Sequence, residues 1–191
     1  MLLHLFVLIS IICSNKLLAQ SSFSRINDSA GIYLSYENFE TGKLTNGFKP
    51  YQKNYSLWPK GFFKYKDIEF ITPDTTAIFK RADIWGYTDH RGRLMRVFNN
   101  RHYKVMCKKG LVIYNIYSPT KASYHFSKTL NEPIYRLTKK NIKTVYADNP
   151  DLLQRIDFIK KKYWLIWDDK TESFLVNELF SKNLTAYPRL D

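Results

Sequence analysis

The chain of 191 residues has few cysteines and no recognisable catalytic or metal-binding spacing. HExxH, CxxC and HxH, which place metal ligands, do not occur, and neither do GxSxG, GxGxxG or a phosphate loop. The catalytic carboxylate pair of a glycosidase cannot be inferred from acidic residues scattered along the chain. Such a pair is defined by the distance between its carboxyl groups in space and not by their spacing in sequence. The sequence therefore supports no known enzyme class, and we expect no metal and no other cofactor.

The N-terminus is the most apolar part of the chain. Residues 2–13, LLHLFVLISIIC, are too short a run to span a bilayer as an ordinary helix, and polar residues and LLAQ follow. This layout predicts a signal peptide over residues 1–20, cleaved near Ala19 or Gln20, with a buried helix as the alternative. A lipoprotein is not expected, because Ile12 stands where a small residue precedes a lipidated Cys13. We expect export to the periplasm or the extracellular space.

Cleavage would remove one of the two cysteines and leave the other, Cys107, without an intramolecular partner. Cys107 lies in an apolar, strand-like segment, so we expect a small buried hydrophobe and not a nucleophile.

Acidic residues are scarce: 17 Asp and Glu oppose 30 Lys and Arg. The chain without residues 1–20 keeps 29 basic and 17 acidic residues, a net charge of +12. Such a charge attracts anions over roughly 8–10 Å at physiological salt. For an exported protein we expect anionic envelope glycan or lipid headgroups as partners, and no nucleic acid. A solvated face that keeps the protein soluble is the favoured explanation of the charge itself, ahead of either kind of partner.

The composition favours β-structure, since aromatics make up 16% of the chain, mainly as 14 Tyr and 13 Phe. Strand patterns come first and helical ones last, which predicts an α+β fold. We expect a flexible lead-in over residues 21–30 and one domain over residues 31–191. Its antiparallel β-meander would occupy about residues 61–137, and its helical part about residues 138–182, packed on one face of the sheet. A short helix would precede the sheet, and residues 43–60 would be loop.

Turn and cap residues set several boundaries. Ser35 is a plausible N-cap of the short helix, which Gly42 would end. Asp89 to Gly92 fits a type I turn, and Asn99-Asn100 suits a tight hairpin.

Later caps are expected at Thr138 and at Asn149, the latter followed by Pro150. For the tail we prefer a helix capped near Asp168 or Asp169 over a hairpin turning at DDKTE. Lys160 to Lys162 would end a helix, where cations suit the dipole.

Three segments together resemble a family. GIYLSYENF, DIWGYTDHRGRLMRVFNNRHYKV and RLTKKNIKTVYADNPDLLQRID are similar, in this order, to small exported proteins of Bacteroidota-type bacteria that are known as domains of unknown function. The resemblance implies an exported bacterial protein. It carries over no catalytic or binding residue.

The densest basic run supplies the candidate site. Arg93, Arg96, Arg101 and Lys104 lie on successive strands and are our candidates for binding an anionic ligand, provided that they share an exposed face. The favoured interpretation is a non-enzymatic cell-envelope module, either binding or structural, with a basic, aromatic-rich surface. The alternative is a small exported hydrolase with a site around His90 and His102. Asp89 does not obviously serve such a site, because neighbouring strand residues point to opposite faces.

Overall fold

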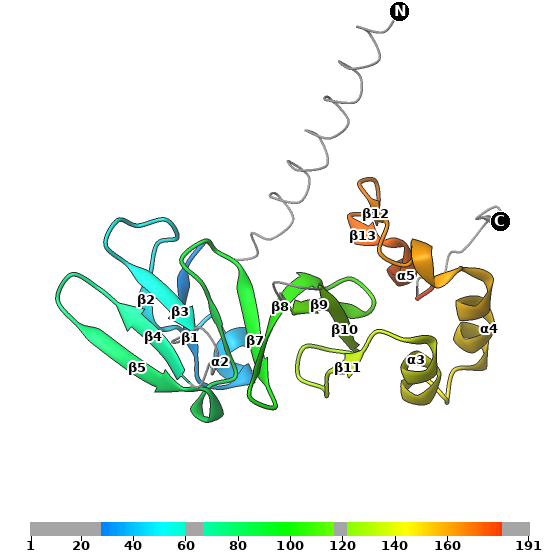
Figure 1. The fold of residues 1–191 in the computed structure, drawn as a ribbon, viewed down its shortest axis with the longest axis horizontal. Coiled ribbons are helices and arrows are strands. Elements are labelled where there is room, and N and C mark those ends of the chain that lie inside the picture. Colours follow the sequence, from blue (N-terminus) through cyan, green and yellow to red (C-terminus); the bar gives the residue numbers. More distant parts are fainter. Residues whose placement is uncertain (1–27, 60–66, 117–121, 181–191) are drawn as a thin grey trace, which may run out of the picture. The chain divides into compact units, whose positions relative to one another are not determined.

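The computed structural model describes residues 28–59, 67–116 and 122–180, and it is an α+β fold with antiparallel sheets, as predicted. The expected signal peptide and most of the lead-in lie outside the described residues. The chain divides into two compact units, residues 1–104 and 105–191 (Figure 1). That residues 31–191 form one domain stays a prediction.

The first unit contains two antiparallel sheets. The strands of the larger one follow the order β8-β7-β6-β1-β2 and are β1 (Ala30–Tyr33), β2 (Thr45–Phe48), β6 (Gly86–Thr88), β7 (Leu94–Phe98) and β8 (Arg101–Cys107), whose last three residues belong to the second unit. The smaller sheet consists of β3 (Ser56–Pro59), β4 (Asp67–Ile71) and β5 (Thr76–Lys80), and η1 (Arg81–Asp83) follows it.

The core of the first unit joins these two sheets. Ile32 and Tyr87 of the larger sheet pack in one buried cluster with Leu57, Ile68 and Phe70 of the smaller sheet. Burying each such side chain contributes roughly 1.5–3 kcal/mol, so this cluster is what holds the sheets together.

Local signals act as predicted in this unit. Ser35 Oγ accepts the Asn38 N–H at 3.1 Å and caps α2 (Tyr36–Glu40), and Gly42 follows with φ +67°. Asn99 and Asn100 have φ of 46° and 58°, the left-handed values of a tight hairpin between β7 and β8.

The prediction of loop over residues 43–60 was wrong. Strand β2 and strand β3 lie in it, paired with β1 and β4 respectively. In β2 only Phe48 is buried and Asn46 has φ +55°, so the segment shows no apolar alternation. Pairing with β1 makes it a strand. The predicted meander begins at about residue 61, and of its first residues, 67–71 are described as β4, whereas residues 61–66 lie outside the described residues.

The second unit combines a short sheet with helices. Its elements are β9 (Val112–Ile116), β10 (Ser123–Ser127), β11 (Tyr135–Arg136), α3 (Lys139–Val145), α4 (Pro150–Phe158) and η2 (Lys161–Tyr163). Thr138 Oγ1 accepts the Asn141 N–H, and Asn149 Oδ1 accepts the Leu152 N–H, both at 3.1 Å. Both predicted N-caps are therefore confirmed.

The tail differs from the preferred prediction. It forms a hairpin of β12 (Trp167–Asp168) and β13 (Ser173–Phe174), followed by one helical turn, α5 (Leu175–Glu178). Asp168 Oδ1 accepts the Lys170 N–H at 2.9 Å and so closes a turn instead of capping a helix. The prediction of a helix that begins near Asp168 or Asp169 was wrong. The Trp167 and Phe174 rings pack against each other across the hairpin, with their centres 5.4 Å apart, and this contact stabilises the hairpin. Within the described ranges, no helix is both long and apolar enough to cross a membrane.

Candidate functional site

The turn between β6 and β7 is built around the buried carboxylate of Asp89. Its Oδ1 accepts the backbone N–H groups of Arg91 at 2.9 Å and Arg93 at 3.0 Å, and its Oδ2 lies 2.6 Å from Arg93 Nη2. The Gly92 N–H donates to the Asp89 carbonyl, and Gly92 has φ +74°. The predicted turn is confirmed. Because its carboxylate is engaged with the turn and Arg93, Asp89 does not orient a catalytic histidine.

The strand register distributes the four predicted anion-binding residues over two faces. Arg96 pairs with Tyr103, so these side chains project to the same face. Arg101 lies two residues before Tyr103 and shares that face, whereas Lys104 follows Tyr103 and projects to the other. The four residues therefore do not form one surface.

Their surroundings differ as well. Arg93 is bound to Asp89, and Arg96 is 3% exposed with its guanidinium 5.3 Å from the centre of the Phe98 ring. Burial lowers the pKa of Lys104, and the nearby Arg93 lowers it further. Arg101 is the exposed member of the set. A common anion site on these residues stays a prediction that their arrangement does not favour.

His90 and His102 lie toward opposite ends of β7. His90 is in the β6–β7 turn, beyond the pairing of Thr88 with Leu94, whereas His102 pairs with Val97. At about 3.4 Å per residue, three strand residues alone separate them by roughly 10 Å. A catalytic pair of these two rings is therefore not formed.

His102 gives the fold a dependence on pH. Its Nδ1 lies 3.2 Å from the Tyr87 hydroxyl, and burial, with a smaller effect of Arg81, lowers its pKa from 6.5 to about 4. The folded state thus resists protonation in the window from pH 6.5 down to pH 4, where the unfolded state binds the proton. Stability is lost as pH falls through this window.

We expect His102 to reduce the free energy of unfolding by about 2 kcal/mol between pH 7 and pH 5. Urea unfolding at the two pH values measures this loss, and His102→Gln, which does not titrate, should remove most of it. An equal loss in the variant would contradict the assignment. Burial also lowers the pKa of His90, so this second ring can contribute to the same loss of stability. His90→Gln is the control that measures its share.

Cys107 is 6% exposed, as predicted. Burial raises the pKa of its thiol, which disfavours the reactive thiolate. Asn177 Nδ2 donates to Sγ at 3.4 Å and to the Leu111 carbonyl at 2.8 Å, and it also donates to the Lys109 carbonyl. The cysteine is part of the packing of the second unit.

The structure assembles a different surface, which the sequence does not reveal. We call it the aromatic–arginine surface: Tyr51, Trp58, His90 and Arg91. The Trp58 and His90 rings lie 4.1 Å apart, and the Arg91 guanidinium lies 5.7 Å from the centre of the Trp58 ring. Arg91 Nε donates to His90 Nε2 at 3.2 Å. Trp58 remains 41% exposed and Tyr51 64% exposed.

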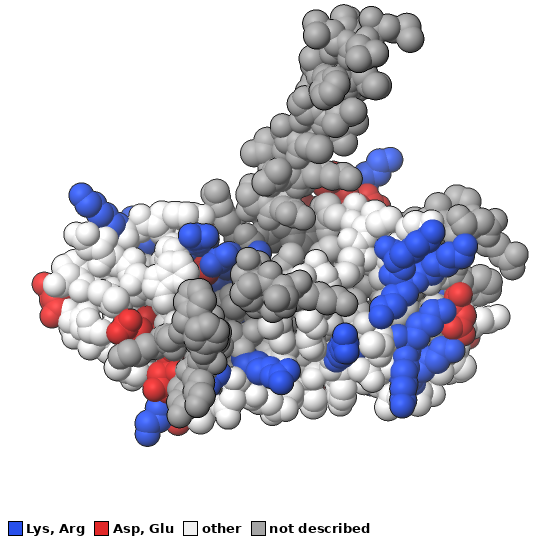
Figure 2. Space-filling model, viewed as in Figure 1, with Lys and Arg blue, Asp and Glu red and all other residues white. Residues whose placement is uncertain are grey.

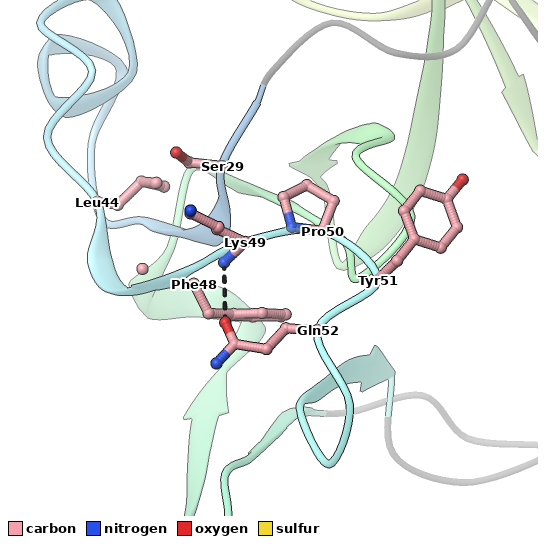
Figure 3. Close-up of a pocket in the computed structure, with 8 residues that line it drawn as sticks. Ser29, Leu44, Phe48, Lys49, Pro50, Tyr51 and Gln52 are labelled. Carbon is pink, nitrogen blue, oxygen red and sulfur yellow. Dashed lines mark hydrogen bonds between the residues drawn. The ribbon is translucent and has the colours of Figure 1, made fainter.

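Backbone contacts fix this surface. The Tyr51 N–H donates to the His90 carbonyl at 2.7 Å and so ties the loop after β2 to the β6–β7 turn. The Lys49 N–H donates to Gln52 Oε1, and the Gln52 N–H returns to the Lys49 carbonyl. This loop also lines an open cavity of about 720 Å³ with Phe48 and Leu44, from which the Tyr51 ring points away (Figure 3).

The charge of the surface rests on Arg91. Burial lowers the pKa of His90, with Arg91 and Arg93 lowering it further and Asp89 raising it, so the ring is neutral at neutral pH. Exposed aromatic faces beside a fixed cation suit a ligand with apolar ring faces and an anionic group. The residues come from three separate segments, and single exposed aromatics form no sequence pattern.

A second basic feature lies on the helices of the second unit. Residues 136–162 hold eight Lys or Arg against three Asp, and Figure 2 shows basic side chains gathered where Figure 1 labels α3 and α4. Lys139 and Lys143 lie 3.1 and 2.8 Å from the carboxylate of Asp157. Their hydrogen bonds hold the pKa of Asp157 below its usual value.

Among the described residues, no group of three His, Cys, Asp or Glu is placed to hold a metal ion. Comparison with protein families, with curated proteins and with solved structures gives no match to this chain. Function must therefore be inferred from the geometry of the site itself.

Proposed function

We propose that the chain is an exported, non-enzymatic binding module of the cell envelope, and that its aromatic–arginine surface binds an anionic glycan. The observation that carries the proposal is the exposed Trp58 ring, held by His90 at 4.1 Å and accompanied by the Arg91 guanidinium at 5.7 Å. A sugar ring offers an apolar C–H face to an indole, and a carboxylate or sulfate offers two oxygens to a guanidinium.

The surface is prepared for binding before the ligand arrives. Asp89 fixes the turn that carries His90 and Arg91, and the Tyr51 N–H is bound to the His90 carbonyl. Less conformational freedom is then lost on binding, which improves affinity.

Sequence features agree with this setting. The apolar run of residues 2–13 supports export, and the net charge of +12 without residues 1–20 steers polyanions toward the protein. A hydrolase built on His90 and His102 is not favoured, because the β7 strand separates the two rings.

Trp58→Ala and Arg91→Gln should each weaken binding of an anionic polysaccharide at least about tenfold, as expected for an aromatic or arginine anchor. Isothermal titration calorimetry at low ionic strength with polygalacturonate and chondroitin sulfate measures this, with dextran as the neutral glycan. Trp58→Ala should weaken polysaccharide binding at high ionic strength as well, because salt does not screen the stacking of a sugar ring on the indole.

Matched controls come from the same unit. Ile78→Ala removes an exposed apolar side chain, and Lys80→Gln removes an exposed cation outside the surface. Both should bind as the unmodified chain does. Absence of binding to both polyanions, or equal losses in the controls, would refute the proposal.

A further inference from the structure

The segment Lys160 to Trp167, KKKYWLIW, combines three lysines with an apolar run, and we call it the KKKYWLIW segment. It contains no acidic residue, and the nearest acidic residues in sequence are Asp157 and Asp168. The prediction that Lys160 to Lys162 end a helix was wrong, because α4 ends at Phe158 and Lys161 and Lys162 lie in η2. The dipole of α4 therefore does not account for these lysines, nor for the exposed Ile166 that follows them.

Buried Trp164 anchors the segment to the second unit. Its side chain is 1% exposed, and its Nε1–H donates to the Ile159 carbonyl at 3.2 Å. The N–H groups of Leu175 and Val176 donate to the carbonyls of Ile166 and Trp164 at 2.8 and 3.1 Å. The backbone is thus held from both sides and is a fixed feature of the fold.

Consecutive turns keep the segment compact. The Tyr163 N–H donates to the Lys160 carbonyl at 2.9 Å, and the Ile166 N–H donates to the Tyr163 carbonyl at 3.0 Å. Lys160, Lys161 and Lys162 are all exposed, and Ile166 is 48% exposed. Exposed cations and an exposed aliphatic side chain therefore lie within seven residues of each other.

The three lysines are not neutralised by acids in the part of the chain that the structure describes. Lys139 and Lys143 share Asp157, whereas no ion pair of the described residues includes Lys160, Lys161 or Lys162. The Lys162 ammonium lies 4.6 Å from the centre of the Tyr163 ring, a contact that leaves its charge available to an anion.

We propose that the KKKYWLIW segment docks the protein on a membrane surface that contains anionic lipids. The lysines contact headgroup phosphates, and Ile166 enters the boundary between headgroups and acyl chains, with the half-buried Trp167 near headgroup level. This inference goes beyond glycan binding and rests on residues of the other unit.

A lipid surface fits better than a soluble polyanion. Both would satisfy the lysines, but a hydrated polyanion gains nothing from Ile166, which has no flat face for stacking. A membrane interface rewards the cation and the aliphatic group together, because electrostatic attraction and apolar burial add there.

The test is sedimentation of the full chain with vesicles of phosphatidylcholine, with and without phosphatidylglycerol. We expect binding to the mixed vesicles, weakened at least about tenfold by Lys160→Gln/Lys161→Gln/Lys162→Gln. Lys43→Gln/Lys53→Gln/Lys80→Gln loses the same charge from exposed positions of the first unit and should bind within about twofold of the unmodified chain. The unmodified chain and the two triple variants have the same N-terminal residues. Differences in vesicle binding between them therefore report on the substituted lysines.

Ile166→Ser tests the apolar contact and should weaken binding about fivefold, an effect that persists when salt is raised. Ile78→Ser, 52% exposed in the first unit, is its control and should change nothing. Equal losses in the two triple variants, or full binding by Ile166→Ser, would overturn the docking segment. Trp58→Ala should keep its vesicle binding, so failure of glycan binding and failure of lipid docking are separate results.

Discussion

Asn177→Asp should lower the free energy of unfolding by about 4 kcal/mol, although it changes only one atom of the side chain. Asn177 is 4% exposed, and its Nδ2 donates to the carbonyls of Lys109 and Leu111 and to Cys107 Sγ. A carboxylate has no proton to donate there. It would place a buried negative charge against two carbonyl oxygens.

Urea unfolding followed by circular dichroism measures this change. Asn131→Asp makes the same substitution at an exposed position of the same unit and should stay within about 0.5 kcal/mol of the unmodified chain. The difference in free energy of unfolding between Asn177→Asp and the unmodified chain, both measured at the same pH, should become smaller on acidification. The protonated carboxyl group can then donate a hydrogen bond again. A loss below about 1 kcal/mol, or one independent of pH, would show that the hydrogen bonds of Asn177 to Cys107, Lys109 and Leu111 do not stabilise the fold as proposed.

Asp89→Ala should cost about 3 kcal/mol of folding free energy and also weaken glycan binding. Asp89 accepts from the N–H groups of Arg91 and Arg93 and pairs with the Arg93 guanidinium, and its side chain is 5% exposed. Removal leaves two backbone donors and a partly buried cation without this partner. The turn that holds His90 and Arg91 beside Trp58 then loosens.

Asp89→Asn separates the two contributions. The asparagine oxygen can still accept the backbone N–H groups, and asparagine suits this turn position, so about half of the lost stability should return. Asp83→Ala removes an exposed acid of the same unit and should be nearly neutral. Calorimetric titration with polygalacturonate beside urea unfolding would show whether stability and binding fall together. Loss of stability with unchanged binding would contradict a role of this turn in the site.

The two substitutions remove contacts that differ in their separation along the sequence. Asp89 contacts residues two and four positions away, whereas Asn177 contacts residues 66 to 70 positions away. The sequence predicted the first arrangement and gave no sign of the second.

The amino-acid sequence by itself determined the α+β class and several local boundaries of the elements. The caps at Ser35, Thr138 and Asn149 and the two turns after β6 and β7 were all predicted. Their energy comes from hydrogen bonds and backbone preferences within a few residues, so the neighbouring letters contain the information. Burial of Cys107 followed in the same way from its apolar neighbours.

Tertiary structure alone decided which side chains meet. Pairing with β1 made a strand of β2, and packing of Trp167 on Phe174 turned a predicted helix into a hairpin. Register placed Arg96 and Lys104 on opposite faces, because a shift of one residue reverses every side chain of a strand. The aromatic–arginine surface likewise exists only where three distant segments come together, since long-range contacts depend on how the whole unit packs.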